Sequence, residues 1–155
     1  MSKQLIEITG FEELQSKIKK LGNDGLKRRE MLKLLRQSSK ATVKAARAQA
    51  PMSKKQHIIS GSRTRKIINP GQLKKSIGNI TGKAKNKAVI YVGPRTKGKK
   101  WEGFYGAFVH GGTKTQSANP FMDRAYRQTK GQVTQETEKS VTRYLQKQIN
   151  KLSNA

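Results

Sequence analysis

The segment of residues 103–126, GFYGAFVHGGTKTQSANPFMDRAY, constrains the fold more than any other part of this chain. It opens with a short run of bulky, β-favouring side chains, which predicts a strand. These side chains are Phe104, Tyr105, Phe108 and Val109. Gly111 and Gly112 permit backbone angles that other residues avoid, so we expect the strand to end there. If Gly111 adopts a positive φ, a valine at that position should be destabilising.

A helix should follow in the second half of the same segment. Asn119 is a suitable N-cap, and Pro120 is favoured in the first helical turn. Phe121 and Met122 begin an apolar side of this helix, and we expect both side chains to be buried. The glycine turn should hold the preceding strand against this helix. The predicted structural and interface motif consists of Tyr105, Phe108, Gly111, Gly112, Thr113, Pro120, Phe121 and Met122.

Residues 26–50 predict a long amphipathic helix, which Pro51 ends because proline disfavours helix in the residue before it. Five basic residues fall within an arc of about 80° on this helix, at about 100° per residue. They are Lys33, Arg36, Lys40, Lys44 and Arg47. Such a stripe is either a solvated outer face or a surface that contacts a polyanion or a partner protein. Because solvated faces normally mix charges of both signs, the single sign favours contact with a polyanion, DNA first.

Shorter signals complete the fold class. Residues 77–81 and 87–92 predict a hairpin, and residues 73–77 a short helical step. A closing helix is expected over residues 132–152. We therefore expect a single α+β domain over residues 1–155. Its small, mainly antiparallel sheet of three to four strands should pack with a long N-terminal helix and a C-terminal helix.

Before the long helix, residues 5–8 predict a short strand and residues 11–21 a helix. The apolar positions of that helix are Phe11, Leu14, Ile18 and Leu21, and Glu12 and Glu13 occupy its first turn.

The charge of the chain is strongly one-sided. Its 155 residues carry a net charge of +25, and 19 lysines and arginines but no acid lie between Met31 and Trp101. Such a surface attracts polyanions and repels copies of itself. Residues 52–69 and 94–102 show no regular period and are expected to be mobile basic loops. Lys97, Lys99 and Lys100 in the second loop should assist the basic stripe.

Nothing in the sequence predicts an enzyme. Cysteine is absent, so there is neither thiol chemistry nor a disulfide, and His57 and His110 are far apart in the chain. His110 is better explained as a strand-end or subunit-contact residue than as a base or ligand. A metal-dependent nuclease needs converging acids, and Glu102 and Asp123 lack a third. We expect no catalytic residue, no metal and no cofactor.

The aromatic residues have structural explanations that compete with nucleic-acid stacking. Trp101 follows a basic loop, where it could stack on a base or anchor the loop against the sheet. Tyr105 and Phe108 fit a core or interface better than a stacking platform. The chain also has no apolar run of transmembrane length and no signal-peptide pattern at its start.

The order of several short motifs resembles the head–tail joining, or tail-completion, proteins at the neck of long-tailed bacteriophages (the gene-product-ten-like family). The motifs are Ala50-Pro51, GQLKKSI at 71–77, YGAFVHGGT at 105–113 and PFMDRA at 120–125. They cover most of the chain in the family's order. Two features depart from the pattern: His110 stands where the family often has an acid, and the loop after Pro51 is unusually long and basic.

The resemblance implies a non-enzymatic virion structural protein that forms a homo-oligomeric ring, with six copies favoured. Its partners would be neighbouring head adaptor and tail proteins and the packaged DNA in the channel, without a membrane. It would lie at the neck of the virion, and in the host cytoplasm during assembly. A lean core, at 33% hydrophobic residues, also suggests that neighbouring subunits complete the fold. The alternative is a basic, sequence-independent nucleic-acid-binding protein that acts as a monomer or dimer.

Overall fold

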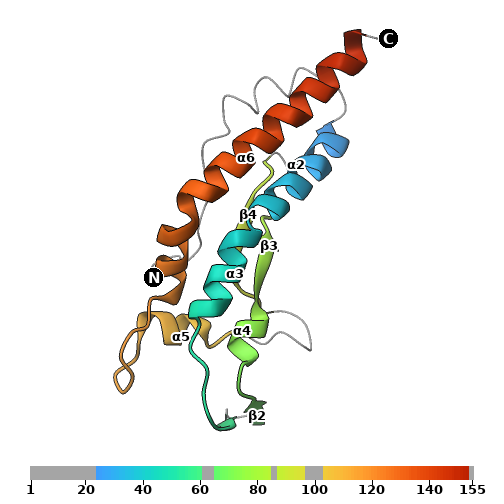
Figure 1. Ribbon diagram of the computed structural model, residues 1–155. Coiled ribbons are helices and arrows are strands. Elements are labelled where there is room, and N and C mark those ends of the chain that lie inside the picture. Colours follow the sequence, from blue (N-terminus) through green and yellow to red (C-terminus); the bar gives the residue numbers. More distant parts are fainter. Residues whose placement is uncertain (1–23, 61–64, 85–86, 97–102, 154–155) are drawn as a thin grey trace.

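A computed structural model describes residues 24–60, 65–84, 87–96 and 103–153 of the chain, and it is a mixed helical and sheet structure (Figure 1). In chain order the elements are α2 (Asp24–Ser38), α3 (Lys40–Gln49), β1 (His57–Ser60), β2 (Arg65–Ile68), α4 (Gln72–Ser76), β3 (Ile77–Thr81), β4 (Ile90–Pro94), α5 (Gly106–Gly111) and α6 (Phe121–Ser153). The strand and helix predicted before residue 22 lie outside the described residues. So do Lys97, Lys99, Lys100, Trp101 and Glu102.

The helices α2 and α3 follow each other along the long helix α6, and the β3–β4 hairpin lies beside them. The elements α4, α5 and the β1–β2 hairpin gather at one end of the molecule (Figure 1). The C-terminal helix expected from the sequence is confirmed. It is longer than predicted, because the helix that starts after Pro120 continues without a break to Ser153.

The long N-terminal helix is not confirmed as one element, because it divides at Ser39. The Ser38 hydroxyl donates to Leu34 O at 3.2 Å, and Ser39 Oγ lies 3.2 Å from Arg36 O and 3.0 Å from Asn79 Oδ1. Serine hydroxyls that bond back to helix carbonyls bend a helix. Main-chain bonds continue on both sides of the junction, since Ser39 N donates to Leu35 O and Val43 N donates to Ser39 O, each at 3.0 Å.

Within the described residues the strands form two separate two-stranded antiparallel sheets, and one sheet of three to four strands is not present there. In the first, His57 lies opposite Ile68, and in the second, Ile77 lies opposite Pro94. The second sheet confirms the predicted hairpin, with its second arm moved to residues 90–94. The other edge of β3 is approached by a helix side chain, because Arg47 donates to Ile77 O at 3.1 and 2.8 Å.

Residues 52–69 are also more regular than predicted, since β1 and β2 lie within them. Two pairs of adjacent isoleucines, at 58–59 and 67–68, carry these strands, and β-branched side chains favour extended backbone. The expectation that this segment lacks regular structure is therefore wrong. Its mobility, and that of residues 94–102, stays a prediction.

The strand predicted over residues 104–109 is wrong, because this segment forms the helix α5. Tyr105 and Val109 are four residues apart, so a helix places both on one face, where they pack against the core. Gly106 lets the start of α5 lie close to Pro94 of β4, because a Cβ at this position would be only 2.7 Å from Pro94 Cγ. The residue that needs a positive φ is Gly112, at 78°, and not Gly111.

The core runs along α6 as a row of buried residues spaced four apart. They are Phe121, Ala125, Thr129, Val133, Thr137 and Val141. Positions at this spacing form a ridge inclined to the helix axis. Along this ridge the first part of α6 contacts α3, and the later part contacts α2. The predicted burial of Phe121 and Met122 is confirmed, at 0% and 2% exposure. Ala46 of α3 and Ala50 at its C-cap are small enough to let the two helices approach closely.

Candidate nucleic-acid interface

All five basic residues predicted to form a stripe are exposed, and the side chains of three of them make no polar contact within the described structure. They are Lys33 of α2 and Lys40 and Lys44 of α3, and we call them the lysine row. If α2 and α3 are treated as one continuous helix, the three fall within an arc of about 40°. None of their side chains has a hydrogen bond or ion pair with any residue that the structure describes. The lysine row therefore keeps its ammonium groups available to a ligand.

The two arginines of the stripe are used differently. Arg36 Nη2 donates to Thr81 Oγ1 at 2.9 Å, and the Arg47 guanidinium holds the carbonyl of Ile77. These three hydrogen bonds tie the α2–α3 face to β3, while both arginine side chains stay largely exposed. The predicted stripe thus divides into the lysine row and two arginines that brace a strand. Both arginines still add positive charge to the same face.

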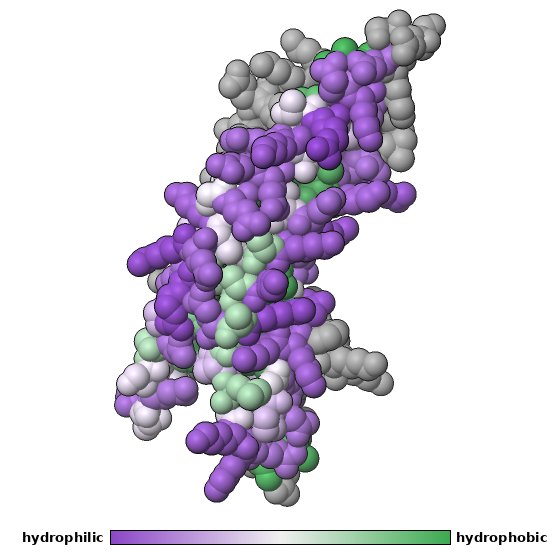
Figure 2. All heavy atoms as spheres, in the orientation of Figure 1, coloured by the Kyte–Doolittle hydropathy of each residue, from purple (hydrophilic) through white to green (hydrophobic). Residues whose placement is uncertain are grey.

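Hydrophilic side chains cover most of the face seen in Figure 2. The lysines of the second basic loop, Lys97, Lys99 and Lys100, lie outside the described residues, so their assistance to the stripe stays a prediction.

Glu30 is an acid on α2, and its negative charge acts on the phenol of Tyr144 in α6. Burial first, and then Glu30, raise the pKa of the Tyr144 phenol above its ordinary value.

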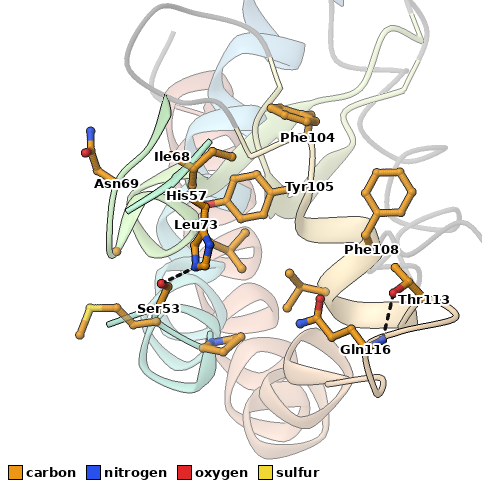
Figure 3. Close-up of a pocket in the computed structure, with 14 residues that line it drawn as sticks. Ser53, His57, Ile68, Asn69, Leu73, Phe104, Tyr105, Phe108, Thr113 and Gln116 are labelled. Atoms are coloured by element: carbon orange, nitrogen blue, oxygen red, sulfur yellow. Dashed lines mark hydrogen bonds between the residues drawn. The ribbon is translucent and has the colours of Figure 1, made fainter. Parts of the chain in front are cut away.

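Three residues of the predicted structural motif, Tyr105, Phe108 and Thr113, line a cavity of about 650 Å³ at the α5 end of the molecule. Figure 3 shows Phe108 of α5 on one side of this cavity and His57 and Ile68 of the β1–β2 hairpin on the other. We call it the apolar groove. Its lining includes Pro51, Met52, Ser53, His57, Ile68, Asn69, Gly71, Leu73, Phe104, Tyr105, Phe108, Val109, Thr113 and Gln116.

The three motif residues that line the groove have distinct roles there. Tyr105 is half-buried against the core, and this burial raises the pKa of its phenol, partly offset by a hydrogen bond with the main chain of Leu73. Phe108 instead lines the groove from the α5 side and is 59% exposed. Thr113 Oγ1 accepts a hydrogen bond from Gln116 N at 3.1 Å, which closes the loop before α6.

The groove also brings together Ser53 and His57, which sequence reasoning missed. Ser53 Oγ lies 2.7 Å from His57 Nε2. A nucleophilic serine needs its histidine oriented by a third group, and no described acid lines this groove. The Ser53 hydroxyl also accepts a hydrogen bond from Lys55 N at 3.1 Å, as in a serine turn. The pair is therefore accounted for as a turn that fixes the start of β1.

His110 differs from its predicted role at a strand end. It lies in α5 and is buried, with Nε2 3.4 Å from Asp123 Oδ2 and its ring edge-on to Phe121 at 5.7 Å. Its Nδ1 has no hydrogen-bond partner among the described residues. These contacts are all to the start of α6, so His110 joins α5 to α6 within one chain.

In the described part of the chain, no three histidine, aspartate or glutamate side chains lie close enough to hold a metal ion. Among the same residues, no helix combines the length and apolar character needed to cross a membrane. No model of a protein family matches the chain, and neither a curated protein nor a solved structure matches it.

Proposed function

We propose that this protein is a non-enzymatic virion structural protein, a ring-forming head–tail connector or tail-completion adaptor at the phage neck. The proposal rests on the ordered motifs of the sequence together with the lysine row. The lysine row is the observation that carries it. A channel that passes DNA needs positive groups that meet phosphates without reading bases, and exposed lysines supply this as point charges.

Ring formation is supported by apolar surface at the α5 end. Met52, Ile58, Ile67 and Phe108 are each about half exposed or more. Both strands of the β1–β2 sheet also have an unpaired edge within the described structure. An added strand from a neighbouring copy could pair with such an edge. Six copies per ring are proposed on the resemblance alone.

Electron microscopy and analytical sedimentation of the purified protein, with and without duplex DNA, test this function. A closed ring of uniform size is the expected result. Because +25 charges repel one another, the ring should be favoured by salt or by DNA. A virion reconstruction that lacks a ring of this protein at the neck would overturn the proposal.

The second candidate is a basic, sequence-independent nucleic-acid-binding protein that acts as a monomer or dimer. The lysine row favours it equally, because phosphate contact does not require a ring. Sedimentation separates the two candidates. A monomer or dimer that stays so on saturating DNA supports this one and contradicts the ring.

A further inference from the structure

The apolar groove has the character of a docking surface. Met52 is 61% exposed and Phe108 59%, and both line the same cavity of about 650 Å³. On the adjoining hairpin, Ile58 and Ile67 lie directly opposite each other and are also about half exposed. Large apolar side chains that gather in this way mark interaction sites more often than ordinary surface.

The surroundings of the groove are positive. Among the described residues, no acid lines it. Lys54 and Lys55 follow directly after the lining residue Ser53, and Lys114 lies in the loop that closes the groove; all three are exposed. The Lys66 ammonium lies 5.0 Å from the centre of the Phe104 ring, a cation–π contact at the groove wall. A complementary occupant would therefore be apolar and acidic.

The chain itself contains such a segment. Residues 4–16, QLIEITGFEELQS, carry three of the nine acids and no lysine or arginine. The same segment includes Leu5, Ile6, Ile8, Phe11 and Leu14. In a chain with a net charge of +25, an acidic and apolar segment of this kind is suited to a basic, apolar groove on a like-charged copy.

Geometry favours a second copy over the same chain. The α2–α3 pair separates Asp24 from the groove by about 38 Å, at about 1.5 Å per helical residue. The helix predicted over residues 11–21 spans about 15 Å, and the short connection to Asp24 adds about 10 Å. Docked in its own chain, that helix would end short of the groove.

We propose that residues 4–16 of one copy dock in the apolar groove of the next. Phe11 and Leu14 would contact Met52 and Phe108, with Glu12 and Glu13 near Lys54 and Lys55. Such a contact joins two different surfaces, so it can repeat around a closed ring. The inference rests on the self-association in the proposed function, and it is independent of DNA binding.

Single cysteines test the contact directly, because the chain has no cysteine of its own. One full-length chain carries Leu14→Cys and the other Phe108→Cys, and the two are mixed under mild oxidation. A mixed disulfide between the two different chains is expected. Ile149→Cys is the matched control: Ile149 is an exposed apolar residue on α6, and it should give little mixed disulfide with Leu14→Cys.

Two outcomes would overturn the inference. One is a chain carrying both Leu14→Cys and Phe108→Cys that closes its disulfide internally at high dilution, which would place the segment in its own groove. The other is the absence of the mixed disulfide in samples that sediment as rings, which would leave the proposed ring intact. Absence of both the rings and the disulfide would contradict the inference and the proposed function together.

Charge reversal provides a second, independent measurement in the full-length protein. Glu12→Lys with Glu13→Lys should weaken self-association several-fold, measured by sedimentation at moderate salt. Lys54→Glu with Lys55→Glu in the same chain should restore most of this loss, because each interface regains opposite charges. Failure of the second pair to rescue the first would contradict the proposed register of the contact.

Discussion

Two phenylalanines show how one residue type serves two purposes in this chain. Phe121 is completely buried in the main core, whereas Phe108 is 59% exposed in the apolar groove. Phe121→Ala should therefore lower the free energy of unfolding by about 3–5 kcal/mol, since it leaves a cavity. Phe108→Ala, the matched control, should change it by less than about 1 kcal/mol. Urea unfolding measures both, and equal losses for the two variants would contradict the assigned burial.

Two glycines provide a similar comparison. Gly112 ends α5 with φ at 78°, and a Cβ there would lie 2.8 Å from Ala118 N. Gly112→Ala should cost more than about 1 kcal/mol of unfolding free energy, because alanine is strained at that φ. Gly131 lies inside α6, and a Cβ added there would meet no described atom within 4 Å, so Gly131→Ala should stabilise by up to about 1 kcal/mol. Thermal melting measures both shifts: a stabilising Gly112→Ala would contradict the first assignment, and a destabilising Gly131→Ala the second.

At the scale of elements, the packing of α3 on α6 includes one buried polar contact. Thr42 Oγ1 lies 2.8 Å from Thr129 Oγ1, and the Thr129 hydroxyl donates to Ala125 O at 2.9 Å. Because a hydroxyl has one hydrogen, Thr42 is the donor to Thr129. Thr129→Val should then cost about 1–3 kcal/mol of unfolding free energy, since it leaves the buried Thr42 donor unsatisfied.

The double variant Thr42→Val with Thr129→Val is the control for that prediction. It removes both hydroxyls at nearly constant volume, so its cost should be below that of Thr129→Val alone. Chemical denaturation of the wild type, the two single variants and the double variant gives the four unfolding free energies of a double-mutant cycle. Strictly additive losses would show that the two hydroxyls do not interact.

Elements with local signals were predicted better than those decided by tertiary packing. The helix start after Pro120 and the hairpin of β3 and β4 have such signals, and both are present. The α5 segment has β-favouring side chains, yet packing of Tyr105 and Val109 against the core selects a helix. At the division in the N-terminal helix, Ser39 also contacts Asn79, a residue distant in sequence whose contact no local pattern shows.

At the scale of the whole molecule, the sequence predicted where the basic face lies but not how its residues are used. The spacing of the five bases is a local property of the helix, and all five remain exposed. Which of them are paired depends on β3, which is brought beside α2 and α3 by folding. The apolar groove could not be predicted either, because its walls come from α5 and a hairpin that local patterns assigned to other structures.

The lysine row carries the central claim of the account, and its contact with DNA can be measured directly. The triple variant Lys33→Gln, Lys40→Gln, Lys44→Gln should keep its fold, because all three side chains are exposed and make no bond to the described residues. Replacing Arg127, Lys139 and Lys147 of α6 by glutamine removes the same charge from other exposed positions and serves as the control.

The measurement is the dependence of the DNA dissociation constant on salt concentration for the wild type and the two triple variants. Each phosphate that a lysine neutralises releases condensed counterions, so loss of the lysine row should lower the salt slope by about 2–3 units. Binding should be independent of DNA sequence, and the α6 control should retain most of the wild-type slope. An unchanged affinity and salt slope for the lysine variant would show that the lysine row does not contact DNA, which would contradict the central claim.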